Sequence, residues 1–370
     1  MNQAKKNDLD IIAPLSGVPD GYLPFVLKDI ALSAKALQVF VTINNEQTTL
    51  LERQIKALDS NVPILTFPGW DCLPYDRVGP SASIVNQRIN TLLTLANSTV
   101  SGLLLVSSNA FIQKIPQKSY FQNKITTISA DENYPRTQLL QTLQQLGYKK
   151  VSTVYEAGDY AVRGSLLDVF VSGQTLPFRI DFFGDEIESI KVFEIDTQTT
   201  LKDQENIVTF HLKPSVEVLQ DVKANKIFCS RYEKLEGPQN PQDDELYLAM
   251  NDNRSFQGIE HWQPLFFEEP FVGIESYLEN PESLIYTDHR VQESLKDQHS
   301  LIFDYYRARL NPVAGHYAHK PLPPELFYKS TFSDCITISS LVDPVSRDLG
   351  GRLLTDFPRR HDNPDFFEDV

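Results

Sequence analysis

The loop formed by residues 14–21 lies where a phosphate-binding loop would open an α/β domain, after a short strand and before a helix. A working loop of this kind presents closely spaced backbone N–H groups, and then a lysine and a hydroxyl that hold the phosphates and the metal. Here Tyr22 and Leu23 follow Gly21 instead. Pro19 also removes one N–H donor from the loop. The sequence therefore predicts that no nucleotide binds here.

Two groups of side chains have the chemistry of metal ligands. His316 and His319 form one group, and the carboxylates Asp181, Asp185, Glu186 and Glu188 form the other. Neither group is joined by further His or Cys residues at the spacing of a zinc site, so solvated side chains are the favoured interpretation. No GxSxG, HExxH or Cys/His signature of catalysis occurs either. We expect this chain to contain no metal site, no cofactor and no catalytic centre.

The segment Phe178–Phe183 alternates in the manner of a β-strand. Phe178, Ile180 and Phe182 share one face, whereas Arg179, Asp181 and Phe183 share the other. The all-apolar face is the natural core, which leaves a phenylalanine beside an arginine on the outer face. Such a pair is typical of a protein-binding hot spot. The alternative, that Phe183 only caps the strand end above the turn Gly184-Asp185, is equally compatible with the pattern.

The loop Phe67–Ser81 is rich in proline and aromatic residues and connects a strand to a helix that begins at Pro80-Ser81. Loops at the carboxyl ends of parallel strands are where such sheets bind ligands. Trp70 and Tyr75 could instead plug the end of the sheet, and this is the interpretation that we favour.

The charge of the chain argues against attraction to nucleic acid as a whole. Its 370 residues include 34 basic and 49 acidic ones, a net charge of −15, so any DNA role needs a local basic patch. The basic clusters Lys149-Lys150 and residues 359–361 are both short enough to be ordinary solvated charge.

The remaining composition points to a cytoplasmic protein. No apolar run approaches the ~20 residues that span a bilayer, and the N-terminus lacks the pattern of a signal peptide. The three cysteines, Cys72, Cys229 and Cys335, are odd in number and far apart, which fits a reducing compartment.

Strand and helix patterns alternate over the first third of the chain, which predicts a parallel α/β domain. The expected strands are Val39–Ile43, Val62–Phe67 and Gly102–Val106, and the expected helices are Phe25–Ala36, Gln47–Leu58 and Ala82–Leu95. A helix over Tyr134–Leu146, stopped by Gly147, opens a second domain. A later strand, Leu284–Thr287, precedes the helix Arg290–Leu310. This unit could extend the first sheet and make the middle of the chain an insertion, and the Pro-rich run Lys320–Pro324 reads as a linker.

Three blocks of sequence together resemble one family. They are FPGWDCLPYDRVGPSASIVNQRINTL, YEAGDYAVRGSLLDVF with PFRIDFFGDEIESIKVFEID, and GIEHWQPLFF. They resemble the N-terminal module of the bacterial transcription-repair coupling factor family (Mfd), which is similar in turn to the excision-repair protein UvrB. The resemblance spans about residues 10–310. It implies a degenerate P-loop, RecA-like parallel sheet of the UvrB domain 1 type with an inserted small α+β domain.

The resemblance also implies a function and a site. Members of the family recruit UvrA through the inserted domain, and the matching positions here are Arg163 of YAVRG and Arg179 and Phe183 of PFRIDFF. In the family, RNA polymerase and DNA are engaged through C-terminal domains, and ATP and magnesium bind in a C-terminal translocase. We therefore expect a non-enzymatic fragment that acts as a protein-interaction module. The hairpin with which UvrB clamps damaged DNA has no counterpart in this sequence.

The resemblance implies four parts. They are residues 1–123 (first part of the helicase-like lobe), 124–212 (inserted UvrA-binding domain), 213–330 (second part of the UvrB-like module) and 331–370 (a linker and the start of a following domain). We expect the polypeptide to be cut from something longer. The rival hypothesis from another class is a nucleotide-binding helicase or ATPase lobe that acts directly on DNA, and a third is a structural platform for other domains. Because neither Arg179 nor Phe183 lies on the apolar face, substitution of either is expected to leave folding almost unchanged.

Overall fold

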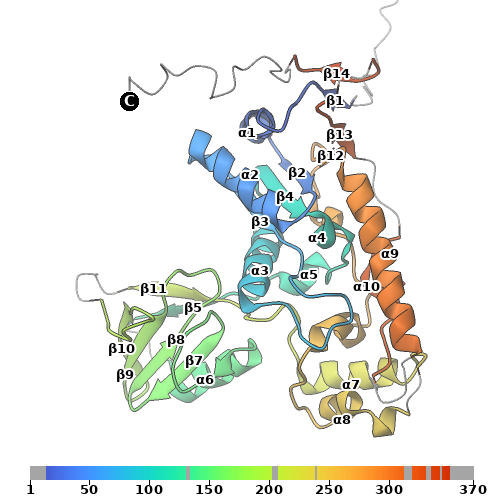
Figure 1. Ribbon diagram of the computed structural model, residues 1–370. Coiled ribbons are helices and arrows are strands. Elements are labelled where there is room, and N and C mark those ends of the chain that lie inside the picture. The colour runs from blue at the N-terminus through green and yellow to red at the C-terminus, as the bar shows by residue number, and fades with distance from the viewer. Residues whose placement is uncertain are drawn as a thin grey trace, which may run out of the picture.

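The structure is a computed structural model that describes residues 14–130, 134–201, 207–237, 240–311, 319–330, 335–341 and 344–350. A parallel sheet covered by helices forms the upper part of the molecule in Figure 1, with the inserted domain (green) and a helical part (yellow) at its lower end. This arrangement confirms the predicted α/β fold with a small α+β insertion.

The large sheet has seven strands that all pair in parallel. Their order is β14 (Arg347–Asp348), β1 (Leu15–Ser16), β13 (Ile336–Ile338), β12 (Ile285–Asp288), β2 (Leu37–Thr42), β4 (Gly102–Ser107) and β3 (Ile64–Phe67). Because β12 pairs directly with β2, the chain returns to the first sheet after a long excursion. The predicted insertion is therefore confirmed.

Helices cover both faces of this sheet, as its doubly apolar strands require. On one face, α1 (Leu23–Ser33) and α2 (Asn45–Leu58) pack with Phe40 and Leu105. On the other face, α3 (Ala82–Asn97), α4 (Ser108–Ile112) and α9 (Val291–Leu310) pack with Val39 and Leu104. The side chain of Ser81 caps α3 by accepting a hydrogen bond from the N–H of Ile84, at the start that the sequence predicts.

The inserted domain is closed where the chain enters and leaves it. Strand β5 (Thr126–Ser129) pairs antiparallel with β11 (Thr209–Leu212). Between them lies α6 (Arg136–Gln145). Gly147 follows its C-cap and has a φ of 84°, the left-handed value expected of a residue that stops a helix. The five-stranded sheet of the domain has the order β10 (Glu186–Val192), β9 (Phe178–Phe183), β8 (Leu166–Val169), β7 (Asp159–Arg163) and β6 (Lys149–Lys150).

The helical part contains α7 (Val222–Tyr232), α8 (Glu245–Asn251) and the 3-10 helix η2 (Ile259–Phe266), which pack on each other. The shorter elements are α5 (Lys118–Phe121), η1 (Pro241–Asp243), η3 (Ile274–Tyr277) and α10 (Pro324–Phe327).

Trp70 and Tyr75 pack against the chain around α10: Tyr75 Oη donates to the carbonyl of Leu322, and the Trp70 ring lies edge-on to Phe327. Both aromatic side chains of the Phe67–Ser81 loop therefore pack against later parts of the chain.

Two segments near the end of the chain differ from the expected linkers. Lys320 and Leu322 are buried, and the carbonyl of Lys320 accepts a hydrogen bond from Trp262 Nε1, so the Pro-rich run is packed into the fold. Residues 336–338 and 347–348, within the expected linker and following domain, supply β13 and β14 to the large sheet. Strands this short carry too few residues for a periodic pattern.

A buried ion pair joins the lobe to the segment that leaves the inserted domain. Arg88 of α3 donates through Nε and Nη2 to the two carboxylate oxygens of Glu217, at 2.6 and 3.2 Å, and through Nη1 to the carbonyl of Pro68. The exposed fractions of the two side chains are 0% and 2%. The guanidinium carbon lies 4.2 Å from the centre of the Phe67 ring, and Trp70 Nε1 also donates to Glu217. Every nitrogen of this buried arginine therefore faces an acceptor or a ring.

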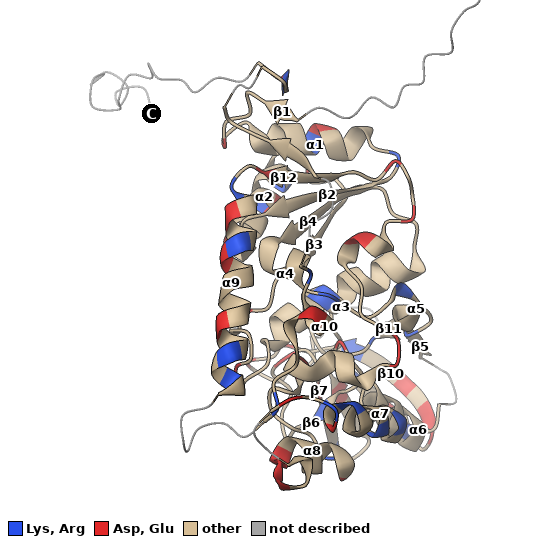
Figure 2. Cartoon of the chain, turned by 90° about the vertical axis from the view of Figure 1, so that its right-hand side faces the viewer, with Lys and Arg blue, Asp and Glu red and all other residues tan. Residues whose placement is uncertain are grey.

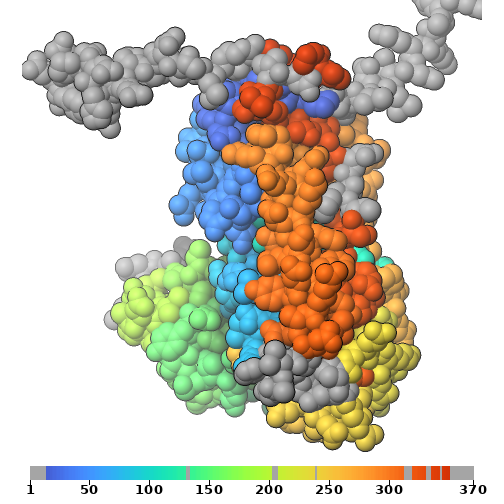
Figure 3. All heavy atoms as spheres, turned by 45° about the vertical axis from the view of Figure 1, so that its right-hand side comes forward, coloured from blue at the N-terminus to red at the C-terminus, as the bar shows by residue number. Residues whose placement is uncertain are grey.

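No helix among the described residues is long and apolar enough to span a membrane. Basic and acidic residues are interspersed along the exposed side of α9 (Figure 2). The inserted domain projects as a separate lobe beside the body of the molecule (Figure 3). Its docking depends on α3, where Asn86 accepts a hydrogen bond from Ser172 and donates to the carbonyl of Ala157.

We predict that Arg88→Ala lowers the free energy of unfolding by about 3–5 kcal/mol, because Glu217 then remains buried without a counter-charge. Urea unfolding of the purified chain measures the loss. The control is Arg53→Ala on the exposed side of α2, which should change stability by less than about 0.5 kcal/mol. Equal stability of the two variants would show that the buried pair is not needed to hold the parts together.

Candidate protein-binding site

The antiparallel sheet of the inserted domain brings the predicted site residues onto one face. In the register of the sheet, Arg163 pairs with Leu166, Leu166 with Asp181, and Phe183 with Glu186. Because the side chains of directly paired residues point to the same side, Arg163, Arg179 and Phe183 share the outer face. The predicted core face is also confirmed, since Phe178, Ile180 and Phe182 are at most 5% exposed.

The outer face is only half open, which the strand pattern did not indicate. A second small core lies on this side of the sheet and consists of Val154, Ala161, Phe170 and Phe193. Two segments, one with Val154 and one with Phe193, cover this core. Gln198, five residues after Phe193, joins them because its Nε2 donates to the carbonyl of Val154. The half that stays open is the end of the sheet with Arg163, Leu166, Asp181 and Phe183.

Phe183 is the most exposed member of the predicted set. Its side chain is 77% exposed at the end of β9, directly before a two-residue turn. Gly184 adopts a φ of 66° there, which a residue without a side chain accommodates at no cost and which suits a tight hairpin. The interpretation that Phe183 packs over the turn as a cap does not fit this exposure. A large apolar ring thus stands in solvent beside a tight turn.

Arg163 is exposed and uses one of its nitrogens to order the neighbouring loop. Its Nη2 donates to the carbonyl of Ser152 at 3.0 Å and to Thr153 Oγ1 at 2.9 Å. Within the described residues, no hydrogen bond from its Nε or Nη1 is seen. The guanidinium is therefore positioned and still has donors that face outward.

Arg179 differs from the expected free outer residue. Its Nε and Nη2 donate to both carboxylate oxygens of Asp168, at 2.7 and 2.9 Å. Nη1 donates to the carbonyl of Gln198 and to Thr200 Oγ1, and the guanidinium carbon lies 4.5 Å from the centre of the Phe193 ring. The hydrogen bonds that Arg179 donates to Asp168 raise the pKa of Arg179 above its ordinary value, more than burial lowers it. The expectation that removal of Arg179 hardly affects folding is therefore revised, since Asp168 is only 1% exposed.

Sequence reasoning missed Asp168, although a signal for it exists. The run Leu166–Val169 is apolar except for Asp168, and alternation places that carboxylate on the outer face beside Arg179. Asp181, between Arg179 and Phe183 on the strand, accepts a hydrogen bond from Ser165 Oγ at 2.9 Å. The face thus presents a ring and charged groups whose orientations are set by neighbours.

The loop after β1 forms hydrogen bonds with later segments of the chain. Asp20 and Asp288 both accept hydrogen bonds from the guanidinium of Arg290, at 3.0 and 2.6 Å from Nη2. The N–H of Val18 donates to the carbonyl of Ser339. Burial alone would raise the pKa of Asp288, but the hydrogen bonds from Arg290 hold it below its ordinary value. The loop thus carries the carboxylate of Asp20 and a committed N–H at Val18, whereas a phosphate site needs free N–H groups and a cation.

The candidate metal ligands do not converge. Within the described ranges, no group of three or more His, Cys, Asp or Glu side chains could hold a metal ion. His316 lies outside the described residues, and Nδ1 of His319 is 2.6 Å from a carboxylate oxygen of the buried Asp244. That pair anchors the chain beside α8, because Asp244 also caps this helix.

Comparison with known proteins agrees with this geometry. Residues 126–213 match the family model of the UvrB interaction domain, which covers the insertion from β5 to β11. The inserted domain is therefore a UvrB interaction domain.

The chain as a whole is a homologue of the transcription-repair-coupling factors. It is 32% identical over 274 residues, 74% of its length, to that of Haemophilus influenzae. It is 35% identical over 215 residues, 58% of its length, to that of Escherichia coli, and 28% identical over 287 residues, 78% of its length, to that of Rickettsia bellii. These alignments cover 23%, 18% and 25% of the relatives, so the chain spans about a quarter of their length.

We predict that Arg179→Ala lowers the free energy of unfolding by about 2–3 kcal/mol, because it strands the buried carboxylate of Asp168. The double variant Arg179→Ala/Asp168→Ala should be less destabilised than the sum of the two single variants. Lys191→Ala, an exposed residue paired with Arg179 across β10, is the control. Denaturant titration followed by near-ultraviolet circular dichroism reports the result, and additive losses would contradict the pairing.

Proposed function

We propose that this chain is a protein-interaction module that recruits the excision-repair protein UvrA through the outer face of its inserted domain. The observation that carries the proposal is the match of residues 126–213 to the UvrB interaction domain, on which Phe183 stands 77% exposed. An exposed aromatic ring beside arginines has the character of an interface anchor, because its burial gains apolar area and an aromatic side chain has few rotatable bonds to fix.

The neighbouring arginines are proposed to act in two different ways. Arg163 has outward donors that can form charge-assisted hydrogen bonds with a carboxylate of the partner. Arg179 forms an ion pair with Asp168 and donates hydrogen bonds to Gln198 and Thr200. It would therefore stabilise the structure of the face as well as contribute charge. Lysine would serve poorly at either position, since it lacks the planar fork.

We propose further that the longer proteins of this type couple transcription to repair in the cytoplasm with the help of parts outside this chain. The name transcription-repair-coupling factor supports this for the relatives, of which the chain spans about a quarter. RNA polymerase, DNA, ATP and magnesium would then bind those other parts. The chain itself would be non-enzymatic, which is supported by the closed loop after β1 and by the net charge of −15.

We predict that Phe183→Ala weakens UvrA binding by about 2 kcal/mol, roughly thirtyfold in affinity, through loss of an anchor ring. Calorimetric titration of UvrA with the variant measures the change. Its melting temperature should equal that of the parent, because the ring packs on no core. The matched control is Phe25→Ala, an exposed phenylalanine 43% accessible on α1 of the lobe. Parent-like binding by a folded Phe183→Ala chain would place the UvrA contact elsewhere.

We predict that the chain binds no ATP, because the loop after β1 presents the carboxylate of Asp20 and no lysine, and the N–H of Val18 is already bonded to Ser339. Titration with a fluorescent ATP analogue and magnesium should show no saturable signal up to about 1 mM, the upper end of typical enzyme KM values. Asp20→Asn tests the role of the negative charge and should also fail to bind, since the loop still lacks a lysine. Saturable binding that unlabelled ATP displaces would favour the rival ATPase hypothesis.

A further inference from the structure

The exposed ring of Phe183 has two carboxylates as fixed neighbours. The hairpin register pairs Phe183 with Glu186, and Asp181 precedes the ring by two residues on β9. Directly paired side chains lie about 5 Å apart on the same side of a sheet. Arg163 lies two strands away, at a spacing of about 5 Å per strand. The open end of the outer face is therefore negative around the ring and positive toward β7.

The carboxylate of Glu186 is solvated in this chain. Its side chain is exposed, and within the part of the chain that the structure describes it forms no ion pair and no hydrogen bond. Asp181, in contrast, is partly buried and accepts a hydrogen bond from Ser165 Oγ. The lysine of the same strand, Lys191, pairs with Arg179, which lies about 13 Å along β9 from Phe183. Glu186 is therefore open to a partner.

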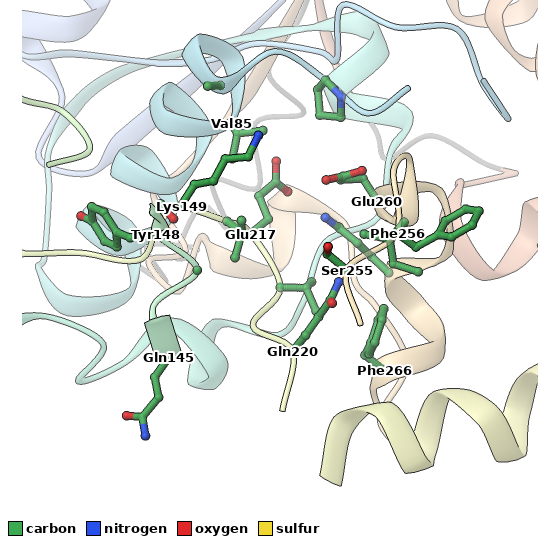
Figure 4. A pocket seen from close by; sticks show the side chains of 18 of the residues that line it. Val85, Gln145, Tyr148, Lys149, Glu217, Gln220, Ser255, Phe256, Glu260 and Phe266 are labelled. Carbon is green, nitrogen blue, oxygen red and sulfur yellow. The ribbon is translucent and has the colours of Figure 1, made fainter. Parts of the chain in front are cut away.

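The open end of the sheet lies away from the body of the molecule. The opposite end docks on α3 through Asn86. On the side of α6, a cavity of about 580 Å³ is lined by Lys149 of the inserted domain and by Glu260 of η2, among others (Figure 4). The turns at Gly164 and Gly184 bound the open end, and no heavy atom of the described chain lies within 4 Å of where a Cβ would stand at either glycine. A partner can therefore cover this end without meeting the lobe.

A partner that buries the ring must also cover Glu186. Because the two side chains are adjacent, a surface that excludes water from the ring of Phe183 also removes water from the carboxylate. Burial of a carboxylate is unfavourable unless a cation or several hydrogen-bond donors replace its water. An acidic surface at this position would be repelled. The ring is thus a good anchor only for a partner that is basic where it faces Glu186.

We propose that Glu186 is a specificity-determining residue of this face, and that the surface of UvrA that covers Phe183 presents a lysine or arginine to it. This inference rests on the proposed function and adds the chemistry of the partner. The face is then bipolar, because Arg163 pairs with an anion on one side of the ring and Glu186 pairs with a cation on the other. A partner turned by half a rotation would meet like charges at both positions, so the two pairs also fix the orientation of binding.

Calorimetric titration of UvrA with charge variants tests the proposal. Glu186→Lys should weaken binding at least about tenfold, because it places two cations together in the interface. Glu186→Gln keeps the shape and removes the charge, so it should weaken binding by a smaller factor. Asp304→Lys, at an exposed position of α9, changes the net charge by the same amount as Glu186→Lys and should bind as the parent does. Melting temperatures of all variants should equal that of the parent, since both positions are exposed.

Parent-like binding by Glu186→Lys would overturn the proposal, and so would Glu186→Gln binding as tightly as the parent. If Glu186→Lys does not fold, Glu186→Gln decides the question alone. Phe183→Ala, titrated in parallel, separates this inference from the proposed function. If Phe183→Ala weakens binding and the Glu186 variants do not, the face is correct and the pairing is wrong. If Phe183→Ala also binds as the parent does, the proposed face and the inference both fail.

Discussion

The arrangement of the whole chain depends on one buried ion pair, that between Arg88 and Glu217. Two fully desolvated charges are stable only if every remaining donor and acceptor is satisfied. The carbonyl of Pro68, the indole of Trp70 and the ring of Phe67 meet that condition. The pair therefore locks three things at once: the helix α3, the loop after β3 and the segment that returns from the inserted domain. Since α3 also holds Ser172 of that domain through Asn86, one helix sets how the domain is presented.

The sequence predicted those features that depend on neighbours along the chain. The core face of β9 follows from three large apolar residues at a spacing of two, and the structure buries all three. The helix start at Ser81 and the helix stop at Gly147 follow from local capping chemistry. The parallel sheet follows from the alternation of strands and helices. Alternation along β9 also placed Arg179 and Phe183 on the outer face, whereas Arg163 was named only because of the family resemblance.

The features that could not be predicted depend on register or on distant parts of the chain. The pairing of Arg179 with Asp168 requires a particular register of β8 against β9, and a shift of one residue would separate them. The cover over half of the outer face comes from irregular segments that carry no periodic signal. Arg88 and Glu217 are 129 positions apart, and nothing local marks either as buried. The Pro-rich run near Leu322 has the composition of a linker. The hydrogen bond that Tyr75 donates to its backbone comes from a distant part of the chain, so the composition could not reveal it.

Open parallel sheets commonly bind ligands at the carboxyl ends of their strands, and in this chain its own side chains occupy those ends. Arg290 holds Asp20 beside β1 and Asp288 at the end of β12. After β3, Gly69 exchanges two hydrogen bonds with Asn45 and donates to Ser107 Oγ at the end of β4. Each contact satisfies a polar group of this edge within the chain itself. The polar groups at this edge are thus bonded within the chain, whereas the ring of Phe183 on the inserted domain stands 77% exposed.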